Sequence, residues 1–168
     1  MKRSARSQSP CSRRSTLGFS LVELIAVLGI LGFLAAAMLP MLEIQIQREK
    51  ERELKRALWE IRDAIDAYKK AAEMGEIAPG SSGSRFPPSL EKLAEGAVDM
   101  KQGGQMRYFL RRVPRDPFAP EELLEDAKTW GLRSYLSPAD KPQPGVDVFD
   151  IYSKSERIGL NGVPLRQW

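Results

Sequence analysis

"LGFSLVELIAVLGILGFLAAAMLP", residues 17–40, is almost wholly apolar. Between residues 19 and 42 the only ionisable side chain is that of Glu23. As a helix, these 24 residues are about 36 Å long, whereas a hydrocarbon core about 30 Å thick needs about 20 residues. The run is therefore long enough to cross a membrane. An ionised carboxylate at the centre of a bilayer costs about 2.5–3.5 kcal/mol, so Glu23 needs an explanation.

Two ordinary interpretations of this N-terminal region remain open. A cleaved secretory signal combines a basic leader, an apolar stretch and a small-residue cleavage site, here Ala35-Ala36-Ala37, and the Arg13-Arg14 pair fits its twin-arginine variant. A plain membrane anchor needs only the apolar run. In either case the basic side chains of the leader are Lys2, Arg3, Arg6, Arg13 and Arg14.

A third interpretation rests on the residues where the apolar run begins. Gly18-Phe19-Ser20-Leu21-Val22-Glu23 resembles the processing motif of type IV prepilins and of the pseudopilins of type II secretion systems. The resemblance implies that a prepilin peptidase removes the leader, residues 1–18, by cutting between Gly18 and Phe19, and then N-methylates Phe19. It makes Glu23 the fifth residue of the mature chain. It also matches Pro40 to the helix-kinking proline that these proteins often carry.

The chemistry of the new N-terminus accounts for the acid. Cutting after Gly18 creates an α-amino group with a reference pKa of about 7.7–8.0, and methylation keeps its positive charge. Glu23 lies about 6 Å from that end along a helix axis, so a neighbouring subunit shifted by a few residues can pair its amine with this carboxylate. In a dry bundle the pairing offsets the burial of both charges and selects one register. The alternative is that Glu23 lies at the level of the lipid headgroups, where its cost is small.

The apolar run continues into a second helical stretch, residues 43–76, that has no proline and no glycine before Gly75. Its apolar side chains recur at spacings of three and four, which predicts one apolar helix face. The members of this stripe are Leu54, Leu58, Ile61, Ile65, Tyr68 and Ala72. Charged residues such as Glu49, Glu51 and Arg52 are expected on the other faces, in solvent. The sequence therefore predicts one long helix over about residues 21–74, bent at Pro40 and ending near Gly75.

Shorter elements follow the long helix. A loop at 77–89 precedes a predicted helix at 90–96, which Ser89 caps and Gly96 closes. A turn at Asp116-Pro117 and a helix at 120–128, starting with Pro120, come next. Strands are predicted at 130–136 and 146–152, and the tail, with an Asn161-Gly162 turn, forms a third strand or an ordered arm. The expected fold class is α+β. The expected architecture is a pilin-like ladle, in which a long N-terminal helix packs against a small antiparallel sheet with short helices.

Composition excludes several kinds of chemistry. Cys11 is the only cysteine and histidine is absent, so Cys/His catalysis and the usual zinc sites are excluded. Removing the five leader residues from the 26 basic side chains leaves 21, against 22 acidic ones, so no basic patch indicates a nucleic acid. Asp116 and the pair Glu121-Glu122 are interpreted as turn and helix charges in solvent rather than as catalytic acids. We predict no catalytic residue.

The resemblance also raises the question of calcium, because major pseudopilins typically bind one Ca²⁺ in their last loops. Calcium prefers six to eight oxygen ligands, several of them charged. The weak candidates in this chain are Asp147, Asp150, Glu156 and Asn161, and basic side chains lie among them. We therefore favour no metal, and the chain is expected to need no cofactor. Without calcium, packing of the tail through Trp168 would have to hold the last loop.

Later segments extend the resemblance to the major pseudopilin of type II secretion systems; they are "FPPSLEKL", "YFLRRVPRDPF", "DVFDIYS" and the terminal Trp168. The implied function is a non-enzymatic subunit of a helical filament that drives protein export across the outer membrane. Its domains would be the leader 1–18, a transmembrane and filament-core helix 19–42, an amphipathic helix 43–76 and a periplasmic domain 77–168.

The implied partners follow from that function. They are further copies of the chain, minor pseudopilins, prepilin peptidase, the inner-membrane assembly platform and the lipid bilayer, with no nucleic acid. The subunit would cross the inner membrane once, with its globular domain in the periplasm, and would join the periplasmic pseudopilus on assembly. The alternatives are a type IV pilin for motility, adhesion or DNA uptake, and a secreted soluble protein cleaved after Ala37.

Overall fold

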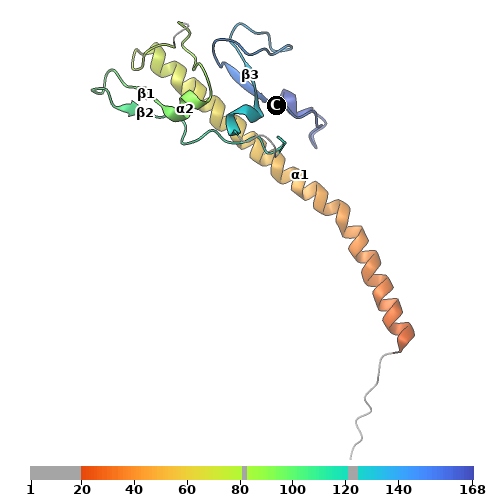
Figure 1. Cartoon of the computed structure of the whole chain (residues 1–168). Helices are drawn as coiled ribbons and strands as arrows, with labels where there is room; N and C mark the ends of the chain where they lie inside the picture. The colour runs from red at the N-terminus through yellow and green to blue at the C-terminus, as the bar shows by residue number, and fades with distance from the viewer. Residues whose placement is uncertain (1–19, 81–82, 121–124) are drawn as a thin grey trace, which may run out of the picture. The chain divides into compact units, whose positions relative to one another are not determined.

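The computed structural model describes residues 20–80, 83–120 and 125–168, and leaves out the side chains of Ala37 and of residues 39–41. The chain divides into two compact units, Met1–Leu42 and Glu43–Trp168. The described part of the first unit is helical, and the strands and short helices that the structure describes all belong to the second unit (Figure 1).

Helix α1, Leu21–Glu73, has 53 residues and confirms the predicted long helix to within one residue. It ends because Gly75 adopts a φ of 66°, a left-handed conformation that suits glycine. The N–H of Glu76 donates to the carbonyl of Ala71 at 2.9 Å and that of Gly75 to Ala72 at 3.1 Å. This pair of bonds is a Schellman motif, which satisfies carbonyls that the helix end would otherwise leave free.

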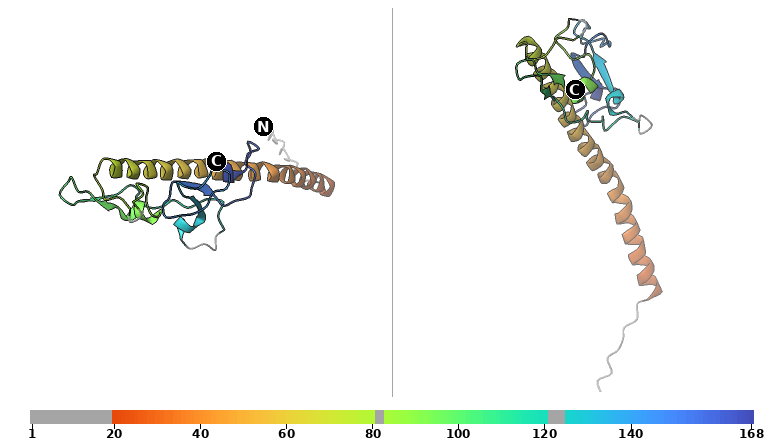
Figure 2. Two further views of the ribbon diagram at one scale, coloured as in Figure 1. Left: turned by 90° about the horizontal axis from the view of Figure 1, so that it is seen from above. Right: turned by 60° about the vertical axis from the view of Figure 1, so that its left-hand side comes forward.

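The core of the second unit lies along one face of α1. The predicted stripe is confirmed, since Leu54 and Ile61 are 0 % exposed and Leu58, Ile65 and Tyr68 are almost as deeply buried. Ala72, at the end of the stripe, is only partly buried. Figure 2 shows the strands and short helices of this unit along one side of the helix. The side chains that these elements and the loops between them bring to the core include Phe86, Leu90, Leu93, Leu110, Val113, Trp130, Val148, Ile151 and Leu165.

The strands form two separate antiparallel pairs rather than one sheet. Strand β1, Ala97–Val98, pairs with β2, Met106–Arg107, a hairpin that the sequence did not indicate. Strand β3, Trp130–Arg133, pairs with β4, Asp150–Ser153, so that Trp130 is opposite Ser153.

The two strand predictions were right in place and wrong in length. Strand β3 stops at Arg133, and β4 begins at Asp150 instead of Val146. The N–H of Phe149 still donates to the carbonyl of Arg133 at 2.8 Å, but that of Val148 donates to the carbonyl of Pro87, also at 2.8 Å. Contacts with the loop before α2 therefore shorten the ladder.

The short helices test the predicted caps. Helix α2, Glu91–Glu95, forms where expected, but its N-cap residue is Leu90 and no side chain caps it, so the predicted Ser89 cap is wrong. Gly96 closes the helix with a φ of 82°, and a Cβ there would lie 2.7 Å from the carbonyl oxygen of Arg107. Glycine is thus required where α2 passes into β1.

Two 3₁₀ helices complete the second unit. Of the helix predicted at 120–128, residues 121–124 lie outside the described residues, and a 3₁₀ helix, η1, forms at Asp126–Thr129. The tail makes an isolated bridge between Ile158 and Pro164 and then a second 3₁₀ helix, η2, at Leu165–Gln167. Of the two expectations for the tail, it matches the ordered arm.

We predict that Ile61→Ala lowers the free energy of unfolding by about 2–5 kcal/mol, because it removes three carbon atoms from a fully buried site. Urea denaturation of the full chain, followed by circular dichroism, measures the change. The matched control is Asp63→Ala, an exposed position two residues further along α1, which should stay within about 0.5 kcal/mol. Equal effects of the two substitutions would contradict the assignment of the core face.

Candidate functional site

The residues that the sequence predicts for processing and assembly lie at the start of the chain. Gly18 and Phe19 lie outside the described residues. Glu23 is in the first turn of α1 and exposed, and the N–H of Leu24 donates to the carbonyl of Ser20 at 3.0 Å as the helix begins. A carboxylate at this end of a helix is favourable, because unpaired N–H groups give it a partial positive charge. Pro40 lies within α1, and its side chain is outside the described part.

The first unit exposes apolar side chains all round its helix. Large apolar residues between positions 21 and 34 are 48–75 % exposed. They are Leu21, Val22, Leu24, Ile25, Val27, Leu28, Ile30, Leu31, Phe33 and Leu34. A helix that is apolar on every face is typical of buried surroundings, either protein or lipid. Over the residues that are described, however, no helix meets the length and apolar character needed for a membrane crossing.

Asp147, the first calcium candidate, is a buried acceptor for three donors. The hydroxyl of Ser134 and the N–H of Tyr135 donate to its Oδ1 at 2.6 and 3.1 Å, and the hydroxyl of Ser84 donates to its Oδ2 at 2.6 Å. Burial by itself raises the pKa of Asp147, but these donors outweigh burial and hold the pKa below its ordinary value. The carboxylate therefore ties the loop before β4 to two other segments.

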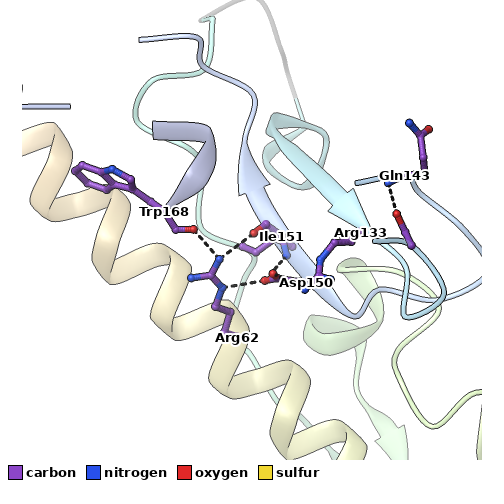
Figure 3. A network of polar contacts seen from close by, with 7 residues as sticks. Arg62, Arg133, Gln143, Asp150, Ile151 and Trp168 are labelled. Atoms are coloured by element: carbon purple, nitrogen blue, oxygen red, sulfur yellow. Dashed lines mark hydrogen bonds and ion pairs between the residues drawn. The ribbon is translucent and has the colours of Figure 1, made fainter. Parts of the chain in front are cut away.

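Asp150, the second candidate, lies between two arginines at the start of β4 (Figure 3). Arg62 of α1 donates from Nε to Oδ1 at 2.9 Å, and Arg133 of β3 donates from Nη2 to Oδ2 at 3.1 Å. The N–H of Ile151 also donates to Oδ1, at 2.8 Å. Both carboxylate oxygens are thus bound by the chain's own donors, two of them cationic.

The remaining candidates lie on the tail. Glu156 is exposed, and the side-chain oxygen of Asn161 accepts the N–H of Val163 at 3.1 Å. Within the described ranges, no group of three or more His, Cys, Asp or Glu residues is placed to hold a metal ion. The structure therefore does not assemble Asp147, Asp150 and Glu156 into one site.

Asp116, which the sequence placed in a solvent-exposed turn, is almost fully buried, so the expectation that its charge is in solvent was wrong. The hydroxyl of Ser153 donates to its Oδ2 at 2.6 Å and the N–H of Phe118 to its Oδ1 at 2.8 Å. Its own N–H donates to the hydroxyl of Thr129 at 3.1 Å. These bonds connect the turn to β4 and η1, which is a structural role. The pair Glu121-Glu122 lies outside the described residues.

The sequence did not reveal the structural roles of two polar residues of α1, Glu51 and Arg62. Glu51 was expected in solvent, but it is only 8 % exposed, so that expectation was wrong. Its position three residues before Leu54 continues the apolar stripe, and a charged residue at such a position is the signal that could have revealed it. Arg62 follows Ile61 directly and also faces the domain, where it binds the main chain as well as Asp150.

Comparison with known proteins gives two relatives, both named "Type II secretion system core protein G". The chain is 24 % identical to that of Klebsiella michiganensis over 140 residues, which covers 80 % of this chain and 91 % of the relative. It is 26 % identical to that of Klebsiella pneumoniae over 147 residues, which covers 88 % and 86 %. No family model matches the chain, and no solved structure does. The two relatives support the resemblance to pseudopilins of type II secretion systems.

We predict that Asp147 makes stability depend on acid pH. Its pKa is lowered in the folded chain, so it stabilises the fold above its ordinary value of 3.8, and this contribution is lost as the pH falls through the lower, folded value. Asp147→Asn should therefore have a lower melting temperature than the unsubstituted chain at neutral pH. The difference between the two melting temperatures should become smaller below about pH 4. Melting temperatures from pH 7 downward measure it. Asp140→Asn, at an exposed carboxylate, is the control, and a gap that is constant with pH would contradict the prediction.

Proposed function

We propose that this chain is a structural, non-enzymatic subunit of a type II secretion pseudopilus, a helical filament that drives protein export across the outer membrane. The observation that carries the proposal is the similarity to two proteins named as core protein G of that system over at least 80 % of the chain. The processing motif at residues 18–23 and the exposed apolar helix that follows it support the same function.

The first proposed step is the removal of the leader peptide. Prepilin peptidase removes residues 1–18 by cleaving the bond between Gly18 and Phe19, and the new amino group of Phe19 is methylated. Methylation leaves the nitrogen protonated and positively charged near neutral pH. The apolar residues 19–42 then hold the subunit in the inner membrane as a single span, with the second unit in the periplasm.

Assembly uses the same helix a second time. In the filament, residues 19–42 of neighbouring subunits form an apolar core that removes the exposed side chains of α1 from water or lipid. Each subunit contacts the next through different surfaces, and head-to-tail contacts of this kind build an open polymer. The inner-membrane assembly platform adds subunits at the base, minor pseudopilins join the filament, and growth pushes substrates outward.

Glu23 selects the register of that core. Its carboxylate accepts a hydrogen bond from the positively charged N-terminus of a neighbouring subunit. Within one chain, the N-terminus and Glu23 lie about 6 Å apart along the helix axis. An unpaired charge in a dry helix bundle is costly, so a wrong register is penalised by both charges at once. The exposure of Glu23 in the isolated chain leaves the carboxylate free to make this contact.

The first test of the proposal is the N-terminus of the mature chain. We expect N-terminal sequencing and mass spectrometry of the membrane-extracted protein to find N-methylated Phe19. Gly18→Val should leave the leader attached, because it replaces the glycine of the processing motif. A mature chain that begins at Met38 would overturn the proposal in favour of a secreted protein.

The second test concerns Glu23 in assembly. Glu23→Ala should be cleaved normally, because it leaves Gly18 and Phe19 unchanged, yet yield at least tenfold fewer filaments when sheared fractions are compared by immunoblot and electron microscopy.

Glu43→Ala is the matched control, since it removes a carboxylate just beyond the apolar run. It should assemble as the unsubstituted chain does. Normal filament yield from Glu23→Ala, with normal cleavage, would refute the proposed role of this acid.

A further inference from the structure

The C-terminal tail, residues 156–168, is bound to α1 by a buried carboxylate, that of Glu51. Glu51 Oε1 accepts the N–H of Leu160 at 2.8 Å and the side-chain amide of Gln47 at 3.0 Å. The same amide nitrogen of Gln47 lies 3.3 Å from the carbonyl oxygen of Ile158, to which it also donates. Two side chains one turn apart on α1 thus bind a main-chain donor and a main-chain acceptor of the tail.

A second attachment lies further along the same helix, at Arg62. Its Nη2 donates to the main-chain oxygen of Trp168 at 2.8 Å and to that of Ile151 at 3.2 Å, while its Nε binds Asp150 (Figure 3). Arg62 is 11 residues after Glu51, which is about 16 Å along the helix axis. Hydrogen bonds to α1 therefore hold the tail near its start and at its last residue, and they also hold the first residues of β4.

The tail between these points folds on itself. The N–H of Gly159 donates to the carbonyl of Val163 at 2.9 Å, and that of Leu165 to Arg157 at 3.0 Å. Leu165 is 0 % exposed, so it anchors the arm in the core. A Cβ on Gly159 would lie 2.6 Å from Cζ2 of Trp168, which shows how closely the indole packs on the turn.

The same region is where the family resemblance implies a calcium ion, and its donor set does not fit one. The oxygens of Asp147 accept three protein donors, and those of Asp150 are bound by two arginines that a cation would have to displace. The tail itself adds Arg157 and Arg166, and Lys154 lies just before it; the charges of these side chains repel a cation. Calcium needs six to eight oxygens with negative charge among them.

We infer that Gln47, Glu51 and Arg62 form a clasp that fixes the tail, residues 156–168, on α1 through protein groups alone, in place of a metal ion. The clasp binds groups that a calcium site would otherwise have to order, namely the main chain of the last loop and the start of β4. The fold of the second unit is consequently independent of calcium, and it depends on the side chain at position 51. The inference concerns the second unit alone, so it stands or falls independently of the proposed secretion function.

The first experiment tests independence from metal. The purified full chain in detergent is melted with excess EDTA and with excess CaCl₂, with MgCl₂ as the ionic control, and unfolding is followed by circular dichroism. We expect the same melting temperature in all three. A calcium-specific rise of several degrees, or a matching loss in EDTA, would overturn the inference, because a ligand that binds only the folded state raises its stability.

The second experiment tests the clasp by limited trypsin digestion of the full chain, with mass spectrometry to locate the cuts. Glu51→Ala leaves the N–H of Leu160 without its acceptor, so cleavage after Arg157 should become at least fivefold faster and the melting temperature should fall by several degrees. Glu51→Gln keeps a side-chain oxygen at this position and should restore most of the protection.

Glu53→Ala is the control, since Glu53 is an exposed acid two residues away on the same helix. It should leave both readouts unchanged. If Glu51→Ala does not fold, Gln47→Ala provides the same test at a half-buried position and should speed the same cut. Unchanged cleavage after Arg157 in the variants that fold would refute the clasp.

Discussion

Burial of one apolar stripe on α1 is the constraint on which the rest of the second unit depends. Leu54, Leu58, Ile61 and Ile65 are at most 2 % exposed, and the α2 helix, both strand pairs and the tail contribute side chains to the same core. The sheets are too small to be stable by themselves, since each has two strands of two to four residues. Each pair acquires its stability by packing against the helix, so the helix has to form for the domain to exist.

The two units use the same helix in opposite ways. In the second unit, polar residues occupy most of the other faces of the helix, so the apolar stripe needs only one partner surface, which the same chain supplies. In the first unit the large apolar side chains between positions 21 and 34 are about half exposed or more, on all sides. Such a helix needs partners outside its own chain. A filament subunit has two such environments in succession, the membrane and the filament core, and both require an apolar surface all round.

Buried polar side chains define the path of the loops. Asp116, Asp147 and Glu51 are each less than 9 % exposed, and each accepts a hydrogen bond from a distant segment. The donor is the hydroxyl of Ser153 for Asp116, and a main-chain N–H for Asp147 and Glu51. A buried carboxylate without donors would be strongly unfavourable, so each one specifies where its donors must lie. The apolar core holds the segments together, while these acceptors select one arrangement among many that bury similar area.

Features that arise from neighbours along the chain could be predicted from the sequence alone. The long helix, its stripe from Leu54 to Tyr68 and its end at Gly75 follow from periodicity and from the conformational freedom of glycine, which act over a few residues. The Gly18–Glu23 motif is equally local. Only the tertiary structure decided that β3 ends at Arg133, that Asp116 and Glu51 are buried, and that Arg62 binds the tail. Glu51 and Leu160 are 109 residues apart in the sequence, and a hydrogen bond across that distance has no local pattern that would predict it.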